Sequence, residues 1–182
     1  MVYKLVMKNI LGIIIVCALL VSCQKDISGT YKALKPLDSC EKEIIVIDGN
    51  NFTRSIYGKY SERYHGKSKG NKDYYITCTF PCTMQCHATL SKDGNKYSAN
   101  ITNAVVKIDK EEFKSYSWKK NNISDDSLIR YFEKNLTEML LKTLNEKKQE
   151  NDYVGFQFVV NGNKLILVGG NEVDDYFIKL VE

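Results

Sequence analysis

Three short turn sequences divide much of this chain into segments that resemble strands. They are Asp48-Gly49-Asn50-Asn51, Asp93-Gly94-Asn95 and Asn161-Gly162-Asn163. Glycine and asparagine tolerate the positive φ of a tight turn, so such a sequence between two strand-like segments is a hairpin signal. The spacing therefore predicts antiparallel strands joined by tight turns, and it restricts the chain to a mainly β fold.

The flanking segments have the composition of strands. Residues 43–48 contain the β-branched run Ile44-Ile45-Val46-Ile47, and residues 154–160 alternate apolar and other side chains with a period of two. We expect Pro81 to end a strand that begins at residue 74, and the polar stretch 58–73 to be a long loop. The expected strands are 43–48, 52–57, 74–80, 86–90, 96–108, 154–160, 165–168 and 176–181, after a first strand that opens at Gly29.

One helix is predicted late in the chain, over residues 124–148. Its apolar residues recur every fourth position and mark a core-facing stripe. They are Leu128, Phe132, Leu136, Leu140 and Leu144, with Ile129, Met139 and Thr143 widening the stripe. Ser124 is the expected N-cap, because its hydroxyl can accept a hydrogen bond from a free amide of the first turn.

Eight or so strands and a single helix predict an antiparallel β-barrel or sandwich with the helix packed on it. Removing residues 1–22 from the 182 leaves 160 residues, which is the size of one domain. We therefore expect a mainly β, single-domain protein over residues 29–182.

The N-terminal region has the layout of an export signal. Lys8 precedes the apolar residues 10–21, and the small residue Ser22 stands before Cys23. Those twelve apolar residues are fewer than the roughly 20 that a membrane-spanning helix needs. An uncleaved amphiphilic terminus, and a secreted protein cut elsewhere, are the alternatives.

The stretch Leu20-Val21-Ser22-Cys23 resembles the lipobox of bacterial lipoproteins. The resemblance implies that residues 1–22 are a signal peptide, that Cys23 is acylated, and that residues 23–28 form a short tether. Gln24, which stands where an aspartate would imply retention in the inner membrane, implies a location in the cell envelope on the outer membrane.

Two further resemblances concern the start of the domain. Gly29-Thr30-Tyr31 resembles the Gly-x-aromatic opening of lipocalin-like barrels. Residues 29–57 also resemble the copper-resistance and surface-sensing envelope lipoproteins, in which a Gly-Thr-Tyr start precedes cysteines, a strand and an Asp-Gly turn. This chain has Cys40 but carries Leu37 at the other cysteine position, a departure that weighs against copper or sensing chemistry.

Cysteine usage predicts disulfides. Cys17 would leave with the signal and Cys23 would carry lipid, so four cysteines remain, and an oxidising compartment favours two disulfides. They are Cys40, Cys78, Cys82 and Cys86, and all three pairings stay open. A soft-metal site that uses three thiolates and His87, and haem attachment at Cys82-x3-Cys86-His87, are alternatives; we predict no metal and no cofactor.

The chain carries little that indicates catalysis or nucleic-acid binding. His65 and His87 are its only imidazoles, and neither lies in a nucleophile motif. Without Lys4 and Lys8 of the signal, 24 basic residues face 22 acidic ones. A net charge of about +2 is too small to indicate a nucleic-acid partner. We predict a protein that is not an enzyme and has no catalytic residues.

The segment 54–75 is the expected partner-binding region, because it interleaves basic residues with tyrosines, the residue types that dominate contact hot spots. Tyr60, Arg63 and Tyr64 lie at its centre. A solvated loop is the plain alternative.

Our leading hypothesis is a membrane-anchored lipoprotein that acts as a binding module, in its sharpest form an immunity or inhibitor protein against a toxin or lytic enzyme. The alternative is a lipocalin-like carrier of a small apolar ligand. The expected partners are the lipid membrane, through acylated Cys23, and either a protein or that ligand.

Overall fold

The computed structural model describes residues 26–37, 40–68, 72–117, 123–149, 156–168 and 176–181. The part of the chain that is described forms nine strands and one helix. In chain order they are β1 (Gly29–Ala33), β2 (Cys40–Asp48), β3 (Asn51–Lys67), β4 (Asp73–Asp93), β5 (Lys96–Ile108), β6 (Lys114–Tyr116), α2 (Asp125–Gln149), β7 (Gln157–Asn161), β8 (Lys164–Leu167) and β9 (Tyr176–Lys179).

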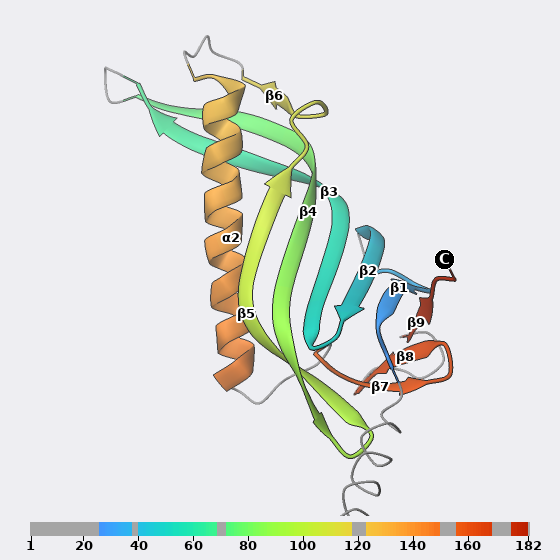
Figure 1. Ribbon diagram of the computed structural model, residues 1–182. Coiled ribbons are helices and arrows are strands. Elements are labelled where there is room, and N and C mark those ends of the chain that lie inside the picture. The colour runs from blue at the N-terminus through green and yellow to red at the C-terminus, as the bar shows by residue number, and fades with distance from the viewer. Residues whose placement is uncertain are drawn as a thin grey trace, which may run out of the picture.

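Eight of the strands close into an antiparallel barrel (Figure 1). They follow the order β3-β2-β1-β9-β8-β7-β5-β4, and pairing between β4 and β3 completes the ring. The short strand β6 pairs with β4 outside the ring. The predicted mainly β fold with one late helix is therefore confirmed, and it takes the barrel form.

The predicted hairpins are also present. Gly49, Gly94 and Gly162 have φ values of 57°, 58° and 62°, which is the left-handed region that glycine adopts without strain. These glycines lie in the turns that join β2 to β3, β4 to β5 and β7 to β8.

Beyond the barrel, β3 and β4 continue as a long two-stranded arm, residues 59–67 and 73–81 (Figure 1). The prediction of a loop over residues 58–73 is wrong. Residues 51–67 pair with residues 89–73 without interruption, because a facing strand satisfies the backbone of even a polar, glycine-containing sequence.

Pro81 does not end a strand, contrary to our expectation, since it lies inside β4. β5 pairs with β4 from Cys82 onward, and β6 pairs with it only over residues 77–79. The Pro81 carbonyl accepts a hydrogen bond from the Asp109 amide. Proline has no N–H to donate. At Pro81 none is required, because β4 changes from one neighbouring strand to the other at this point.

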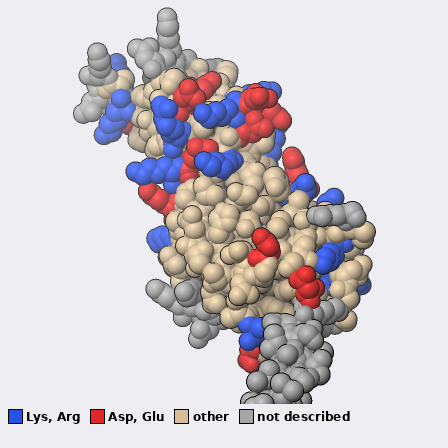
Figure 2. All heavy atoms as spheres, in the orientation of Figure 1, with Lys and Arg blue, Asp and Glu red and all other residues tan. Residues whose placement is uncertain are grey.

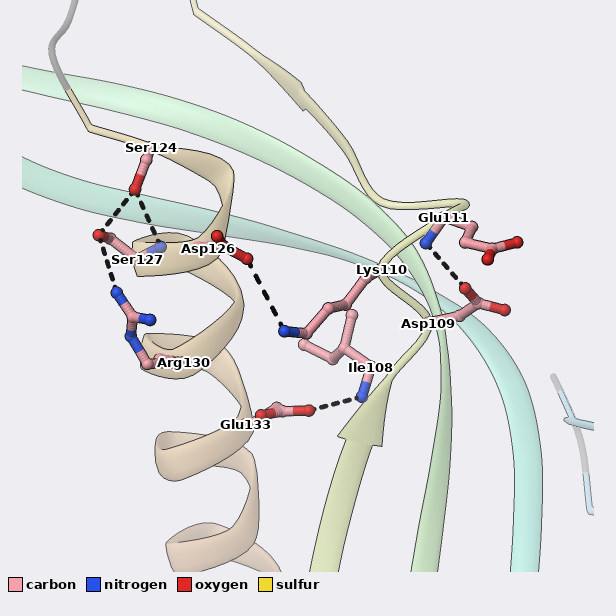
Figure 3. Close-up of polar contacts among 9 residues, drawn as sticks. All are labelled: Ile108, Asp109, Lys110, Glu111, Ser124, Asp126, Ser127, Arg130 and Glu133. Atoms are coloured by element: carbon pink, nitrogen blue, oxygen red, sulfur yellow. Dashed lines mark hydrogen bonds and ion pairs between the residues drawn. The ribbon is translucent and has the colours of Figure 1, made fainter.

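The helix α2 lies along β5 and across the arm (Figure 1). It begins as predicted, because the Ser124 hydroxyl accepts a hydrogen bond from the Ser127 amide at 3.3 Å. Figure 3 shows this cap and the Glu133 carboxylate, which accepts a hydrogen bond from the Ile108 amide at 3.0 Å. Thr137 accepts one from the Val106 amide in the same way. Helix side chains thus replace a neighbouring strand along this edge of β5.

Most of the predicted helix stripe packs into the core: Leu128, Ile129, Phe132 and Leu136 are buried. Met139, which is 57% exposed, and Thr143, which is also exposed, do not belong to the stripe. The core has two parts. One fills the barrel around Tyr31, Ile45, Phe52 and Phe158. The other lies between the helix and the sheet, and its buried members are Ile76, Cys78, Phe80, Cys82, Val106, Ile108, Phe113, Leu128, Ile129, Phe132 and Leu136.

Candidate functional site

A buried ion pair lies inside the barrel. Glu43 and Arg54 are 2% and 7% exposed, and the Arg54 guanidinium donates to the Glu43 carboxylate. Both face inward because strands alternate: Glu43 shares a face with Ile45, and Arg54 shares one with Phe52. We did not predict this pair from the sequence, although the period of two that places Ile45 inside places Glu43 there as well.

The ion pair borders a cavity of about 330 Å³ where the barrel core meets the helix. Apolar side chains from both cores form most of its wall. The cavity is lined by Ala33, Lys35, Leu37, Glu43, Arg54, Ile56, Cys86, Leu140, Leu144, Phe156, Leu167, Tyr176 and Phe177. Lys35 and Leu37 are exposed and mark its rim. The site thus combines an apolar wall with one polar end, as small-molecule sites usually do.

Among the described residues, the polar end pairs one positive charge with one negative charge. The Arg54 guanidinium also lies over the Phe156 ring, 5.5 Å from its centre, a favourable cation–π position. Cys86 pairs with Arg54 across the strands. Burial raises the pKa of the Cys86 thiol, and Arg54 partly offsets that shift. Cys86 therefore adds no negative charge at neutral pH, and the carboxylate of Glu43 balances Arg54.

A larger hollow of about 430 Å³ lies near Asp26 at the other end of the barrel. Its wall includes Asn50, Ser91 and Lys92, which are exposed. Since its polar groups already face water, this hollow offers a ligand little apolar burial. The cavity beside Arg54 is the stronger candidate for a binding site.

No protein-family model, curated protein or solved structure matches this chain. The assignment of the candidate site therefore rests on the geometry of this structure alone.

The prediction of two disulfides is wrong. Cys40, Cys78, Cys82 and Cys86 are all free thiols. The last three lie on one face of β4 at four-residue spacing, so neighbours are about 13 Å apart, whereas a disulfide joins Cα atoms about 4.4–6.8 Å apart. Every two-disulfide pairing needs a bond between two of these three. Residues 81–85, which were expected to connect two strands, lie inside β4 and hold the cysteines apart.

The thiols lead to a test. We expect alkylation of the unfolded, unreduced protein, followed by peptide mass spectrometry, to find Cys40, Cys78, Cys82 and Cys86 all modified. A reduced sample, as the control, should give the same result. Finding any of the four unmodified without reductant would contradict the structure.

The same thiols predict how stability depends on pH. Burial raises the pKa of Cys78 from 9.0 to about 11 and that of Cys82 to about 12. The folded state therefore holds these protons more tightly than the unfolded state. Their contribution to stability is complete below pH 9 and declines as the pH rises toward 11–12.

The structure separates the three predicted partner-binding residues. Tyr60 and Tyr64 lie on the arm's helix side: both pack against the helix–sheet core, and the Tyr64 ring meets the Tyr131 ring edge-on at 4.9 Å. Burial, with Cys40 and Cys82 nearby, raises the pKa of Tyr60 to about 12. Arg63 is exposed on the opposite side. The three residues thus do not form one surface.

The alternative metal site is not assembled either. His87 contacts Thr53 at 3.2 Å, and it is adjacent to Cys86 in β4, so it faces the other side of the strand. Within the described ranges, no group of three or more His, Cys, Asp or Glu side chains is placed to hold a metal ion. No helix within those ranges is long and apolar enough to cross a membrane. Cys23 and the lipobox lie outside the described residues.

Proposed function

We propose that this protein is a lipid-anchored, non-enzymatic binding protein that holds a small uncharged amphiphile in the cavity beside Arg54. The observation that carries the proposal is the buried Arg54–Glu43 pair at one end of an otherwise mostly apolar cavity of about 330 Å³. In this form of the carrier hypothesis, the ligand has both an apolar body and a polar group.

The size and wall of the cavity support this ligand class. Small-molecule sites commonly occupy about 300–1,000 Å³, so the cavity suits a compact ligand. Leu140 and Leu144 of the helix and Phe177 of β9 line it. Burying apolar ligand surface against them contributes roughly 25 cal/mol per Å².

The polar end selects against charged ligands. Guanidinium N–H groups can donate to a ligand oxygen, and the carboxylate can accept from a hydroxyl or amide. At the buried end, a fatty-acid carboxylate would add a second negative charge beside Glu43, which costs several kcal/mol. Lys35 at the rim offsets little of this cost, because it is exposed and its charge is screened by water. An alcohol or an amide with a hydrocarbon chain therefore fits better than a fatty acid.

Decanol and decanoate are suitable probes of this proposal. At about ten times its dissociation constant, decanol should raise the melting temperature by roughly 3–6 °C, and decanoate should raise it less. Leu144→Trp, which fills part of the cavity, should remove the decanol effect. Met139→Trp, on the exposed side of the same helix, is the matched control and should retain it. No shift with decanol, or an equal shift in both variants, would refute the cavity as the site.

The membrane anchor is part of the proposal and has its own test. We expect Cys23→Ala to abolish lipid attachment and to move the protein out of the membrane fraction, since stable anchoring needs covalent acyl chains. Mass spectrometry of the wild-type N-terminus should show acyl groups on Cys23. A mature N-terminus that starts elsewhere, or that lacks acyl mass, would remove the lipoprotein assignment.

A second candidate function is the protein-binding module, including an immunity or inhibitor protein. One observation favours it: exposed aromatic and cationic side chains gather on the arm, where Arg63 lies over the Tyr75 ring. This function does not require the cavity, so the two proposals can fail separately.

A further inference from the structure

We propose that the side of the arm that faces away from the helix docks an acidic surface of a partner protein. We call this side the arm face. It comprises the odd-numbered residues of β3 from 59 to 67 and of β4 from 73 to 79, together with Lys114 and Tyr116 of β6. This inference rests on the second candidate function and is independent of the cavity.

Strand alternation sorts the arm into two unlike sides. On the helix side, Tyr60, Tyr64 and Tyr74 pack against the helix–sheet core. On the arm face, every residue that β3 contributes is exposed. The register places β6 on the same face, because Thr77 pairs with Arg63 on one side and with Tyr116 on the other. Among the described residues, the arm is thus a two-sided sheet with one side covered by the helix.

The arm face carries an ordered aromatic and cationic cluster around Tyr75. The Arg63 guanidinium lies 5.7 Å from the centre of the Tyr75 ring, and the His65 ring stacks on the same tyrosine at 4.9 Å. His65 Nε2 is 2.9 Å from the Asp73 carboxylate. These contacts hold the side chains in place before binding, so less side-chain entropy is lost when a partner docks.

The apolar surface of the face is unusually open. Tyr75 is 53% and Tyr116 59% exposed. Tyrosine and arginine are the residue types most enriched in binding hot spots. Two exposed tyrosines beside an arginine therefore match the centre of a protein interface, and this cluster replaces the predicted one of Tyr60, Arg63 and Tyr64.

Charge determines the chemistry of the partner. Lys59, Arg63, Lys67 and Lys114 belong to the face, and Asp73 is its acidic residue. The net charge is then 4 − 1 = +3 with His65 neutral. The side of the molecule that carries the helix is different: Figure 2 shows Lys, Arg, Asp and Glu intermixed over its upper half. A face with a net positive charge attracts an acidic surface, and it repels a second copy of itself.

The position of the face favours a protein over the anchoring membrane. Residues 26–28 line a hollow with Asn50, Ser91 and Lys92, at the end of the barrel opposite the arm. Asp73 and Ser91 are 18 residues apart along β4, a path of roughly 60 Å at about 3.3 Å per residue. With the lipid attached at Cys23, as proposed, the arm extends away from the bilayer.

Decaglutamate, as a simple acidic polypeptide, and vesicles that contain phosphatidylglycerol are the probes for the test. The full mature chain should bind decaglutamate at low salt, with amide NMR shifts concentrated at Arg63, Tyr75 and Tyr116. Binding should weaken as NaCl is added, because exposed charges are screened. The double variant Lys59→Glu, Arg63→Glu should bind about tenfold or more weakly.

The matched control reverses the charge of two lysines on the helix, away from the arm face. Lys134 and Lys142 are exposed on the helix, and Lys134→Glu with Lys142→Glu should change decaglutamate binding less than about twofold. Both double variants should still bind decanol, which separates failure here from failure of the cavity. Absent decaglutamate binding, an equal effect of the control, or shifts at this face caused by the vesicles alone would overturn the proposal.

Discussion

Replacing Glu43 with leucine should lower the free energy of unfolding by about 3–5 kcal/mol. Arg54 is 7% exposed and Glu43 2%, so the substitution removes the Glu43 carboxylate from beside a buried guanidinium. The cost of an unbalanced buried charge far exceeds the apolar gain of a leucine side chain. Urea denaturation followed by circular dichroism would measure the loss.

The double variant Glu43→Leu, Arg54→Met is the control for this prediction. Replacing both members of a buried ion pair with apolar residues is often neutral, so the double variant should recover most of the stability that Glu43→Leu loses. It should also lose its preference for decanol over decanoate, because the polar end of the cavity is gone. A single variant within about 1 kcal/mol of the wild type would show that Arg54 is not buried as described.

Replacing Phe80 with alanine should cost about 3–5 kcal/mol. Phe80 is fully buried, and its ring lies 5.7 Å from the Phe113 ring and 5.4 Å from the Phe132 ring. It therefore joins the arm, the segment after β5 and the helix. Removing it leaves a hole that none of these elements can easily fill.

Met139→Ala is the matched control, because Met139 is 57% exposed on the same helix that Phe80 supports. It should change stability by less than about 0.5 kcal/mol. Hydrogen exchange provides a second measurement. The Val106 and Ile108 amides donate hydrogen bonds to helix side chains, so they should exchange faster in Phe80→Ala. A loss below about 1 kcal/mol with unchanged exchange would mean that the helix is held mainly by other contacts.

Local sequence signals predicted the parts of the fold that depend on neighbouring residues. The turns at Gly49, Gly94 and Gly162 and the helix cap at Ser124 all lie where expected. Each is decided within about four residues, by positive φ in the turns and by a side-chain acceptor at the helix start. Short-range patterns were therefore sufficient for the hairpins and for the helix.

The arm could not be predicted in this way. Residues 58–67 lack the apolar alternation of a strand, and they are held by their pairing with β4. Pro81 is tolerated only because β4 changes neighbours at that point. A further irregularity falls between His87 and Ala88, where the register with β5 shifts by one residue. As a result, the inward-facing residues of β5 change from odd-numbered ones (Tyr97, Ala99) to even-numbered ones (Ala104, Val106). All three features depend on long-range pairing.

The candidate site was partly accessible from the sequence. Alternation alone places Glu43 beside Ile45, and Arg54 between Phe52 and Ile56, on inward faces. It does not show that β2 and β3 pair so as to bring the two charges together. The cavity itself depends on the approach of Leu140 and Leu144 from a helix about 90 residues later in the chain.

The central claim is that the cavity beside Arg54 holds an uncharged amphiphile, and native mass spectrometry tests it most directly. The full-length protein would be extracted gently from its own membrane, with Leu144→Trp prepared alongside. We predict about one small uncharged amphiphile per wild-type chain, in line with a single site, and none on the variant. Wild-type protein that carries no such molecule, or a variant that carries the same amount, would contradict the claim.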